Sequence, residues 1–190
     1  AKVGMTFARG LRAILRQDPD VVMVGEIRDQ ETAEIAVQAS LTGHMVLSTL
    51  HTNTAVGAIT RLVDIGVEPY LIASSLKGVL AQRLVRRLCT HCRQPHSLDR
   101  AEARLLGDPG IEGQQAFVAT GCEECQHTGY RGRQGVYELL VVDREVADMI
   151  HNKAGENDIL RYLGGNMHSL MSEGRRLVLE GKTSIDELLR

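Results

Sequence analysis

The chain has 190 residues, of which 43% are hydrophobic and only 3% aromatic, so an aliphatic core can form in one large domain or two small ones. Its 22 Lys and Arg residues nearly balance its 24 Asp and Glu residues, which argues against a nucleic-acid binder held by bulk charge. No apolar run approaches the roughly 20 residues that span a bilayer, and no signal-peptide pattern is present, so we expect a cytoplasmic protein.

Helices and strands are predicted to alternate in the first part of the chain. Helical spacing of apolar residues predicts a helix over 7–16, which ends before Pro19 because proline disfavours helix in the residue before it. Four apolar residues over 21–24 predict a strand buried on both faces, as in parallel sheets. A helix over about 31–40 follows.

The same pattern then repeats. A second buried strand is predicted over 45–47, and Thr52 or Asn53 can cap the helix that follows it. The remaining predicted elements are helices over about 55–65 and 69–81 and a half-exposed strand over 83–88. Alternation of strand and helix is typical of an α/β domain with a parallel sheet, and residues 1–88 are predicted to be the second half of such a domain.

Four cysteines, the only ones in the chain, form two C-x-x-C pairs. Paired cysteines without an export signal favour reduced thiolates and zinc over disulfides. Four thiolates close the tetrahedral coordination sphere, so the predicted zinc site is structural, with the ligands Cys89, Cys92, Cys122 and Cys125. His91 or His127 could replace one thiolate. A nucleic-acid zinc ribbon is a weaker alternative, because few aromatic residues accompany the nearby arginines.

The rest of the chain is predicted to form two further segments. Residues 89–142 hold the tetracysteine module, a glycine-rich run over 129–135 and a strand over 136–142. Residues 143–190 have a helical pattern and form a C-terminal helical region.

Polar side chains follow both predicted buried strands, where ligands bind in α/β sheets. The first strand is followed by Glu26, Arg28 and Asp29, and the second by Thr49, His51 and Asn53. A carboxylate at this place can coordinate Mg²⁺ or orient an attacking water for phosphoryl transfer. A structural pair between Glu26 and Arg28 is the alternative interpretation.

Two longer motifs resemble those of the secretion ATPase superfamily. Residues 18–29 (DPDVVMVGEIRD) resemble its Walker B segment, and residues 42–53 (TGHMVLSTLHTN) resemble its His box. The tetracysteine pairs occur in type II secretion and type IV pilus-assembly ATPases but not in retraction ATPases. Three further stretches are most similar to the type II secretion ATPases, protein E of the general secretory pathway: 54–62, 78–85 and 129–133.

This resemblance implies the C-terminal half of a RecA-like P-loop ATPase domain, with an inserted tetracysteine zinc module and a helical C-terminal region. It implies that Glu26 is the catalytic carboxylate and that Arg28, His44 and His51 contact the nucleotide, with ATP and Mg²⁺ in the intact enzyme. A capping or core role is the alternative for His44. Three helix arginines are expected to be a solvated basic face, although they could include groups that reach phosphate across a subunit boundary: Arg9, Arg12 and Arg16.

The chain does not begin with methionine, so we expect a fragment. The P-loop pattern Gly-x-x-x-x-Gly-Lys-[Ser/Thr] is absent from the sequence, so we expect this fragment to be inactive alone. The resemblance further implies a homo-hexamer on the cytoplasmic side of the inner membrane, attached peripherally to secretion platform proteins and binding no nucleic acid. Its function would be to power pseudopilus assembly and the export of folded proteins. The alternatives are a type IV pilus-assembly ATPase and a non-catalytic, zinc-stabilised protein-binding module.

Overall fold

The computed structural model describes residues 6–164 and 167–190, which divide into two compact units. The first unit takes in the described residues up to 79 and residues 140–164, and the second takes in residues 80–139 and the described residues after 166. The segments alternate because strands β3 (Gly78–Leu88) and β6 (Tyr130–Val141) each have residues in both units. The units therefore do not coincide with the three consecutive segments, bounded at 88 and 142, that the sequence predicts.

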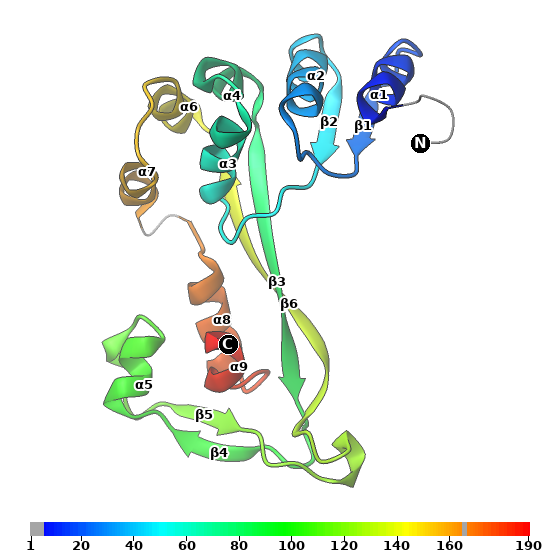
Figure 1. Ribbon diagram of the computed structural model, residues 1–190. Helices are drawn as coiled ribbons and strands as arrows, with labels where there is room; N and C mark the ends of the chain where they lie inside the picture. The colour runs from blue at the N-terminus through cyan, green and yellow to red at the C-terminus, as the bar shows by residue number, and fades with distance from the viewer. Residues whose placement is uncertain (1–5, 165–166) are drawn as a thin grey trace. The chain divides into compact units, whose positions relative to one another are not determined.

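The first unit begins with the predicted alternation of helices and parallel strands (Figure 1). Its opening elements are α1 (Phe7–Leu15), β1 (Val21–Val24), α2 (Gln30–Leu41) and β2 (Met45–Ser48). Strand β1 pairs in parallel with β2, from Val21 opposite Met45 to Val24 opposite Ser48. The two strands therefore end at the same edge of the sheet.

The two faces of this sheet differ in burial. Val22 and Val24 lie in a core cluster with Ala8 and Leu11 of α1 and Ile35 of α2. The opposite face is exposed, with 46–78% exposure for its four apolar residues: Val21, Met23, Met45 and Leu47. The prediction that these strands are buried on both faces is therefore wrong for this chain, because nothing in the described residues covers the second face.

Four helices complete the first unit: α3 (Gly57–Ile65), α4 (Pro69–Ser75), α6 (Arg144–His151) and α7 (Glu156–Leu163). The predicted caps of α3, Thr52 and Asn53, are wrong, because the helix begins later. Instead, the hydroxyl oxygen of Thr54 accepts a hydrogen bond from the Gly57 N–H at 3.0 Å.

Helix α4 ends at Ser75, so the prediction of helix as far as residue 81 is wrong. The chain leaves the helix at Leu76, which has extended backbone, and pairs with β6 from Gly78 onward. A Cβ at Gly78 would lie 3.1 Å from the carbonyl oxygen of Leu140 on β6. Pairing between strands thus replaces the helical turn that the local apolar spacing favours.

The second unit contains most of β3 and β6 and the antiparallel pair β4 (Gln94–Ser97) and β5 (Gln115–Val118). Strand β6 begins at Tyr130, so the glycine-rich run belongs to the strand rather than leading into it. The helices of this unit are α5 (Arg100–Leu105), α8 (Leu170–Leu179) and α9 (Ile185–Leu189), with short 3₁₀ turns over Pro109–Ile111 and Glu123–Cys125.

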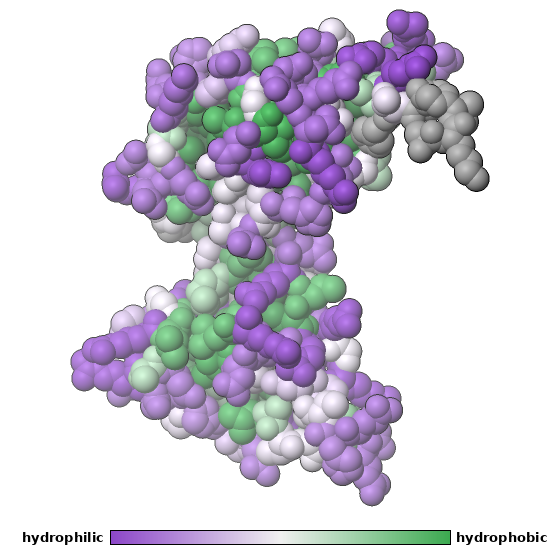
Figure 2. All heavy atoms as spheres, in the orientation of Figure 1, coloured by the Kyte–Doolittle hydropathy of each residue, from purple (hydrophilic) through white to green (hydrophobic). Residues whose placement is uncertain are grey.

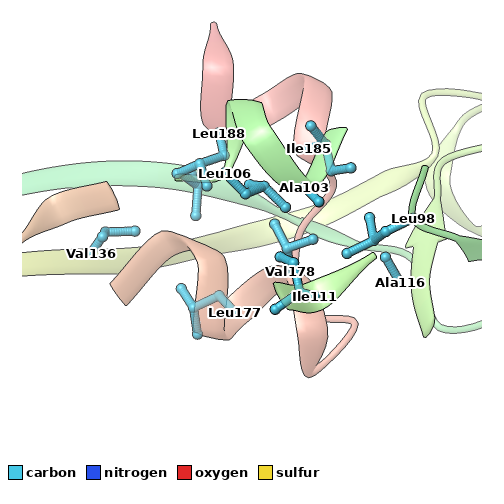
Figure 3. Close-up of a cluster of buried hydrophobic side chains, with 11 residues drawn as sticks. Leu98, Ala103, Leu106, Ile111, Ala116, Val136, Leu177, Val178, Ile185 and Leu188 are labelled. Carbon is cyan, nitrogen blue, oxygen red and sulfur yellow. The ribbon is translucent and has the colours of Figure 1, made fainter. Parts of the chain in front are cut away.

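A buried aliphatic cluster joins these elements (Figure 3). Leu98 and Leu106 meet Leu177 and Val178 of α8 and Leu188 of α9 in this cluster. Because α6 to α9 all lie after residue 143, the predicted helical pattern of the C-terminal region is confirmed. Hydrophilic residues cover much of the visible surface in Figure 2. Within the described residues, no helix combines the length and apolar character that a bilayer crossing needs.

Candidate functional site

Glu26 lies in the connection between β1 and α2, at the carboxyl end of the parallel pair. The connection is fixed at its far end by Asp29, whose carboxylate accepts a hydrogen bond of 2.8 Å from the Thr32 N–H and caps α2. Within it, the half-buried Ile27 packs against the core cluster of α1 and β1. Strand pairing, packing and capping thus fix the place of Glu26.

The Glu26 carboxylate contacts two cationic or proton-bearing side chains. One oxygen pairs with the guanidinium of Arg28, and the other lies 3.1 Å from Nε2 of His51. The Glu26 side chain is 19% exposed, whereas those of Arg28 and His51 are 74% and 86% exposed. The hydrogen bond from Arg28 lowers the pKa of Glu26, with burial opposing it and the charge of Arg28 adding to it.

The site therefore presents an ionised carboxylate at the edge where ligands bind in α/β folds. A carboxylate of this kind can orient water or ligate a divalent cation. The ion pair between Glu26 and Arg28 is also the contact that the alternative interpretation, a purely structural pair, predicts. Since both of its partners are largely exposed, a ligand can reach Arg28 and His51 from solvent.

Thr49 connects the ends of the two strands beyond their last paired residues. Its hydroxyl donates a hydrogen bond of 2.6 Å to the carbonyl of Gly25, and its own carbonyl accepts one of 3.1 Å from the Ile27 N–H. The sequence places Thr49 at this edge but assigns it no role. A role for Thr49 could have been inferred from its position directly after β2, inside the motif that resembles a His box.

His44 is not brought together with Glu26. It precedes β2, so it lies at the amino edge of the sheet, and a four-residue strand separates the edges by about 13 Å. Its Nδ1 lies 3.1 Å from the carbonyl of Ala39 and 3.2 Å from the hydroxyl of Thr42, at the C-terminal end of α2. These are the contacts of a capping histidine, and a nucleotide role for His44 stays a prediction.

On α1, Arg12 pairs with Glu31 at 3.1 Å, and both side chains are at least half exposed. This contact fits the solvated basic face that the sequence predicts for this helix.

The four cysteines come together although their two pairs lie far apart in the sequence. All four Sγ atoms lie within 4.8 Å of one another, with Cys89 to Cys122 at 3.9 Å and Cys92 to Cys125 at 3.8 Å. Sulfur atoms bound tetrahedrally to one zinc at about 2.3 Å would lie about 3.8 Å apart. The donor set and its spacing therefore fit a tetrahedral zinc ion.

The surroundings of Cys125 also suit a thiolate ligand. Its sulfur accepts hydrogen bonds of 3.2 Å from the N–H groups of both Cys122 and Gly129. Burial opposes ionisation of this thiol, but these N–H groups, together with hydrogen bonds from the side chains of Cys122 and Cys92, lower the pKa of Cys125 to about 6. The metal-ligand cluster contains neither His91 nor His127.

The whole chain, residues 1–190, matches the model of a family described as type II/IV secretion system protein. A protein from Pseudomonas aeruginosa named type II secretion system protein E is 62% identical over 190 residues, which are 100% of this chain and 38% of that protein. A Vibrio cholerae protein named type II secretion system ATPase E is 58% identical over 189 residues, with the same shares. The chain therefore spans 38% of the length of these relatives.

Solved structures share the fold. The pilus retraction motor PilT, crystallised with bound ADP, superposes with a TM-score of 0.65 at 28% identity, over 96% of this chain and 42% of PilT. The ATPase DotB of Legionella pneumophila gives 0.66 at 24% identity, over 96% and 41%. The predicted fold class is confirmed: this mixed α/β chain has part of the RecA-like fold of secretion ATPases, with four cysteines clustered as for a metal.

Proposed function

Since the chain belongs to the type II/IV secretion system protein family, we propose that it is part of the ATPase motor that powers type II protein secretion. The motor would use ATP hydrolysis to drive pseudopilus assembly and the export of folded proteins. The names of the relatives, type II secretion system protein E and ATPase E, favour this function over type IV pilus assembly. The clustered strand-end residues favour it over a non-catalytic binding module.

The observation that carries the proposal is the place and charge of Glu26. This carboxylate stands at the carboxyl edge of the parallel pair, its pKa is lowered, and its partners face solvent. Glu26 would orient the attacking water, while Arg28 and His51 would contact the phosphates from the same edge. Mg²⁺, when bound, would neutralise phosphate charge there, and Glu26 could hold it.

The proposed catalytic site would also need phosphate-binding elements. The P-loop pattern that cradles the β- and γ-phosphates is absent from the printed sequence. We therefore expect the 190-residue chain alone not to hydrolyse ATP at a useful rate. The relatives it matches are longer, with room for the missing phosphate-binding elements.

The tetracysteine cluster would hold zinc in a structural role. The spacing of the four sulfur atoms and the N–H groups directed at Cys125 support this assignment. Because four thiolates fill a tetrahedral sphere, no position is left for a reacting water. The metal would fasten the turns after β3 and before β6 to each other.

The resemblance to secretion ATPases also supports a proposed setting for the intact protein. It would be a homo-hexamer that binds nucleotide between neighbouring subunits. It would lie in the cytoplasm, attached peripherally to secretion platform proteins of the inner membrane. No nucleic-acid partner is proposed, because the basic and acidic residues nearly balance.

Replacement of Glu26 by glutamine in the intact protein tests the proposed reaction. Glutamine keeps the shape of the side chain but removes its charge, so we expect ATP to bind with little change while kcat falls by roughly a hundredfold or more. Steady-state phosphate release and equilibrium nucleotide binding measure the two effects. Near-normal turnover in Glu26→Gln would remove the catalytic role.

Two controls make this comparison specific. Glu34 is an exposed carboxylate on α2 that accepts a hydrogen bond from Gln30, and Glu34→Gln makes the same chemical change away from the sheet edge. Its turnover should match that of the unmodified protein. The 190-residue chain alone is the second control, and brisk Mg²⁺-dependent turnover by it would contradict the requirement for a P-loop.

A further inference from the structure

One residue, Thr49, holds the backbone on both sides of Glu26. Its hydroxyl donates to the carbonyl of Gly25, which precedes Glu26, and its carbonyl accepts from the N–H of Ile27, which follows it. The parallel ladder between β1 and β2 ends one residue earlier, at Val24 opposite Ser48. These two hydrogen bonds therefore extend the connection between the strands past the ladder and around the carboxylate.

Packing does not replace the hydroxyl contact on the Gly25 side. Gly25 has no side chain, and a Cβ built on it would meet no atom within 4 Å. Ile27, in contrast, packs against the core cluster of α1 and β1. On this side of Glu26, the Thr49 hydroxyl holds the Gly25 carbonyl through a hydrogen bond of 2.6 Å.

The segment that carries Thr49 also carries a partner of the carboxylate itself. His51 lies two residues farther on, and its Nε2 is 3.1 Å from a carboxylate oxygen of Glu26. One short segment thus contacts both the backbone and the side chain of Glu26. A shift of this segment would move the carboxylate with it.

We propose that Thr49 is a positioning residue for Glu26. Through this contact, Thr49 couples the segment after β2 to the hydrolytic step. This inference rests on the proposed function, in which Glu26 orients the attacking water. Hydrolysis depends on that water being held within a fraction of an ångström, whereas nucleotide binding draws on many contacts. Loss of the hydroxyl should therefore lower kcat and leave KM for ATP almost unchanged.

The test compares three variants of the intact protein. Thr49→Val keeps the β-branched shape and removes the donor, and we expect its kcat to fall by about tenfold or more, since small misplacements of catalytic groups cost this much. Thr49→Ser keeps a hydroxyl and should recover most of the turnover. Thr60→Val makes the same change at an exposed position of α3 and should behave as the unmodified protein.

Each outcome decides the inference. Low kcat with unchanged KM and unchanged unfolding temperature in Thr49→Val, together with recovery in Thr49→Ser, supports it. Normal turnover in Thr49→Val overturns it, as does an equal loss in Thr49→Ser or a loss that follows a lowered unfolding temperature. Glu26→Gln, measured beside them, separates the two proposals: if only Glu26→Gln is inactive, the proposed function stands and the role of Thr49 is lost.

Discussion

Single residues determine whether the tetracysteine cluster can bind metal, and Cys125 is the most informative of them. Its buried sulfur accepts two backbone N–H groups, which favour the thiolate that zinc requires. We expect one zinc per chain in protein purified without chelators, and none in Cys125→Ala. Zinc at a thousand times its Kd would add about 4 kcal/mol to the free energy of unfolding, so Cys125→Ala should also unfold at a lower temperature.

Metal analysis and thermal unfolding of the same samples check this prediction, and His91→Asn is the control. His91 lies between the cysteines of the first pair in sequence but outside the sulfur cluster. His91→Asn should keep its zinc and its unfolding temperature. A metal-free wild-type protein after gentle purification would contradict the zinc assignment.

Residues whose positions follow from local sequence could be predicted. Glu26 and His51 were found because each follows an apolar strand, and the two strands end at one edge. His44 precedes its strand instead of following it, and its ring contacts the carbonyl of Ala39 near the end of α2, which the strand pattern does not specify. The hydrogen bonds of Thr49 depend on the register between two strands, which no single-strand pattern specifies.

Among the elements, α9 is tied to β3 by one ion pair with several hydrogen bonds. Glu187 of α9 accepts from the N–H of Arg86 at 3.0 Å and from its Nε and Nη2 at 2.8 and 2.6 Å. The guanidinium also lies 4.1 Å from the ring centre of Tyr130 on β6. Hydrogen bonding from Arg86 lowers the pKa of Glu187, so the carboxylate is ionised at neutral pH.

Glu187→Gln should lower the free energy of unfolding by about 1–2 kcal/mol at neutral pH, a value discounted because Arg86 is 40% exposed. A lowered pKa stabilises the fold above the ordinary glutamate pKa, and this stabilisation is lost as pH falls through the folded-state pKa. The difference between variant and wild type should therefore shrink in acid. Urea unfolding at neutral and acid pH measures it.

The exposed pair of Glu124 with Arg131, at 3.3 Å, is the matched control for this measurement. Glu124→Gln should change the free energy of unfolding by no more than about 0.5 kcal/mol, because solvent screens such a pair. Equal effects of the two substitutions would contradict a special role for Arg86 and Glu187 in holding α9.

Element types were predicted more successfully than element boundaries. The helices before and after β1 were found from apolar spacing, since each packs one face on the core. The end of α4 at Ser75 was missed because the residues after it have apolar spacing that also suits a helix, and the partner strand β6 is distant in sequence. Pairing with a strand distant in sequence decided this boundary, and the residues next to the boundary carry no information about that partner.

For the whole molecule, the order of segments along the sequence did not predict the division into two compact units. The cysteine pairs suggested consecutive domains, but the two units draw on alternating stretches of the chain. Such alternation arises when long strands pair across a large sequence separation, as β3 and β6 do. The burial of the β1–β2 sheet was misjudged for a related reason, because an apolar strand shows that both faces can be buried but not by which residues.

The exposed apolar face of that sheet leads to a prediction about the intact protein. Met23 is 78% exposed here, and the chain spans 38% of the length of its relatives, so we expect other residues of the intact protein to cover this face. Met23→Lys should then increase the solubility of the 190-residue chain but destabilise the intact protein by about 2 kcal/mol or more, because a charge replaces a buried methionine. Gln38→Lys, on the exposed surface of α2, should do neither. Solubility and unfolding measurements on both forms decide the matter, and an intact Met23→Lys protein as stable as wild type would show that the face stays open to solvent.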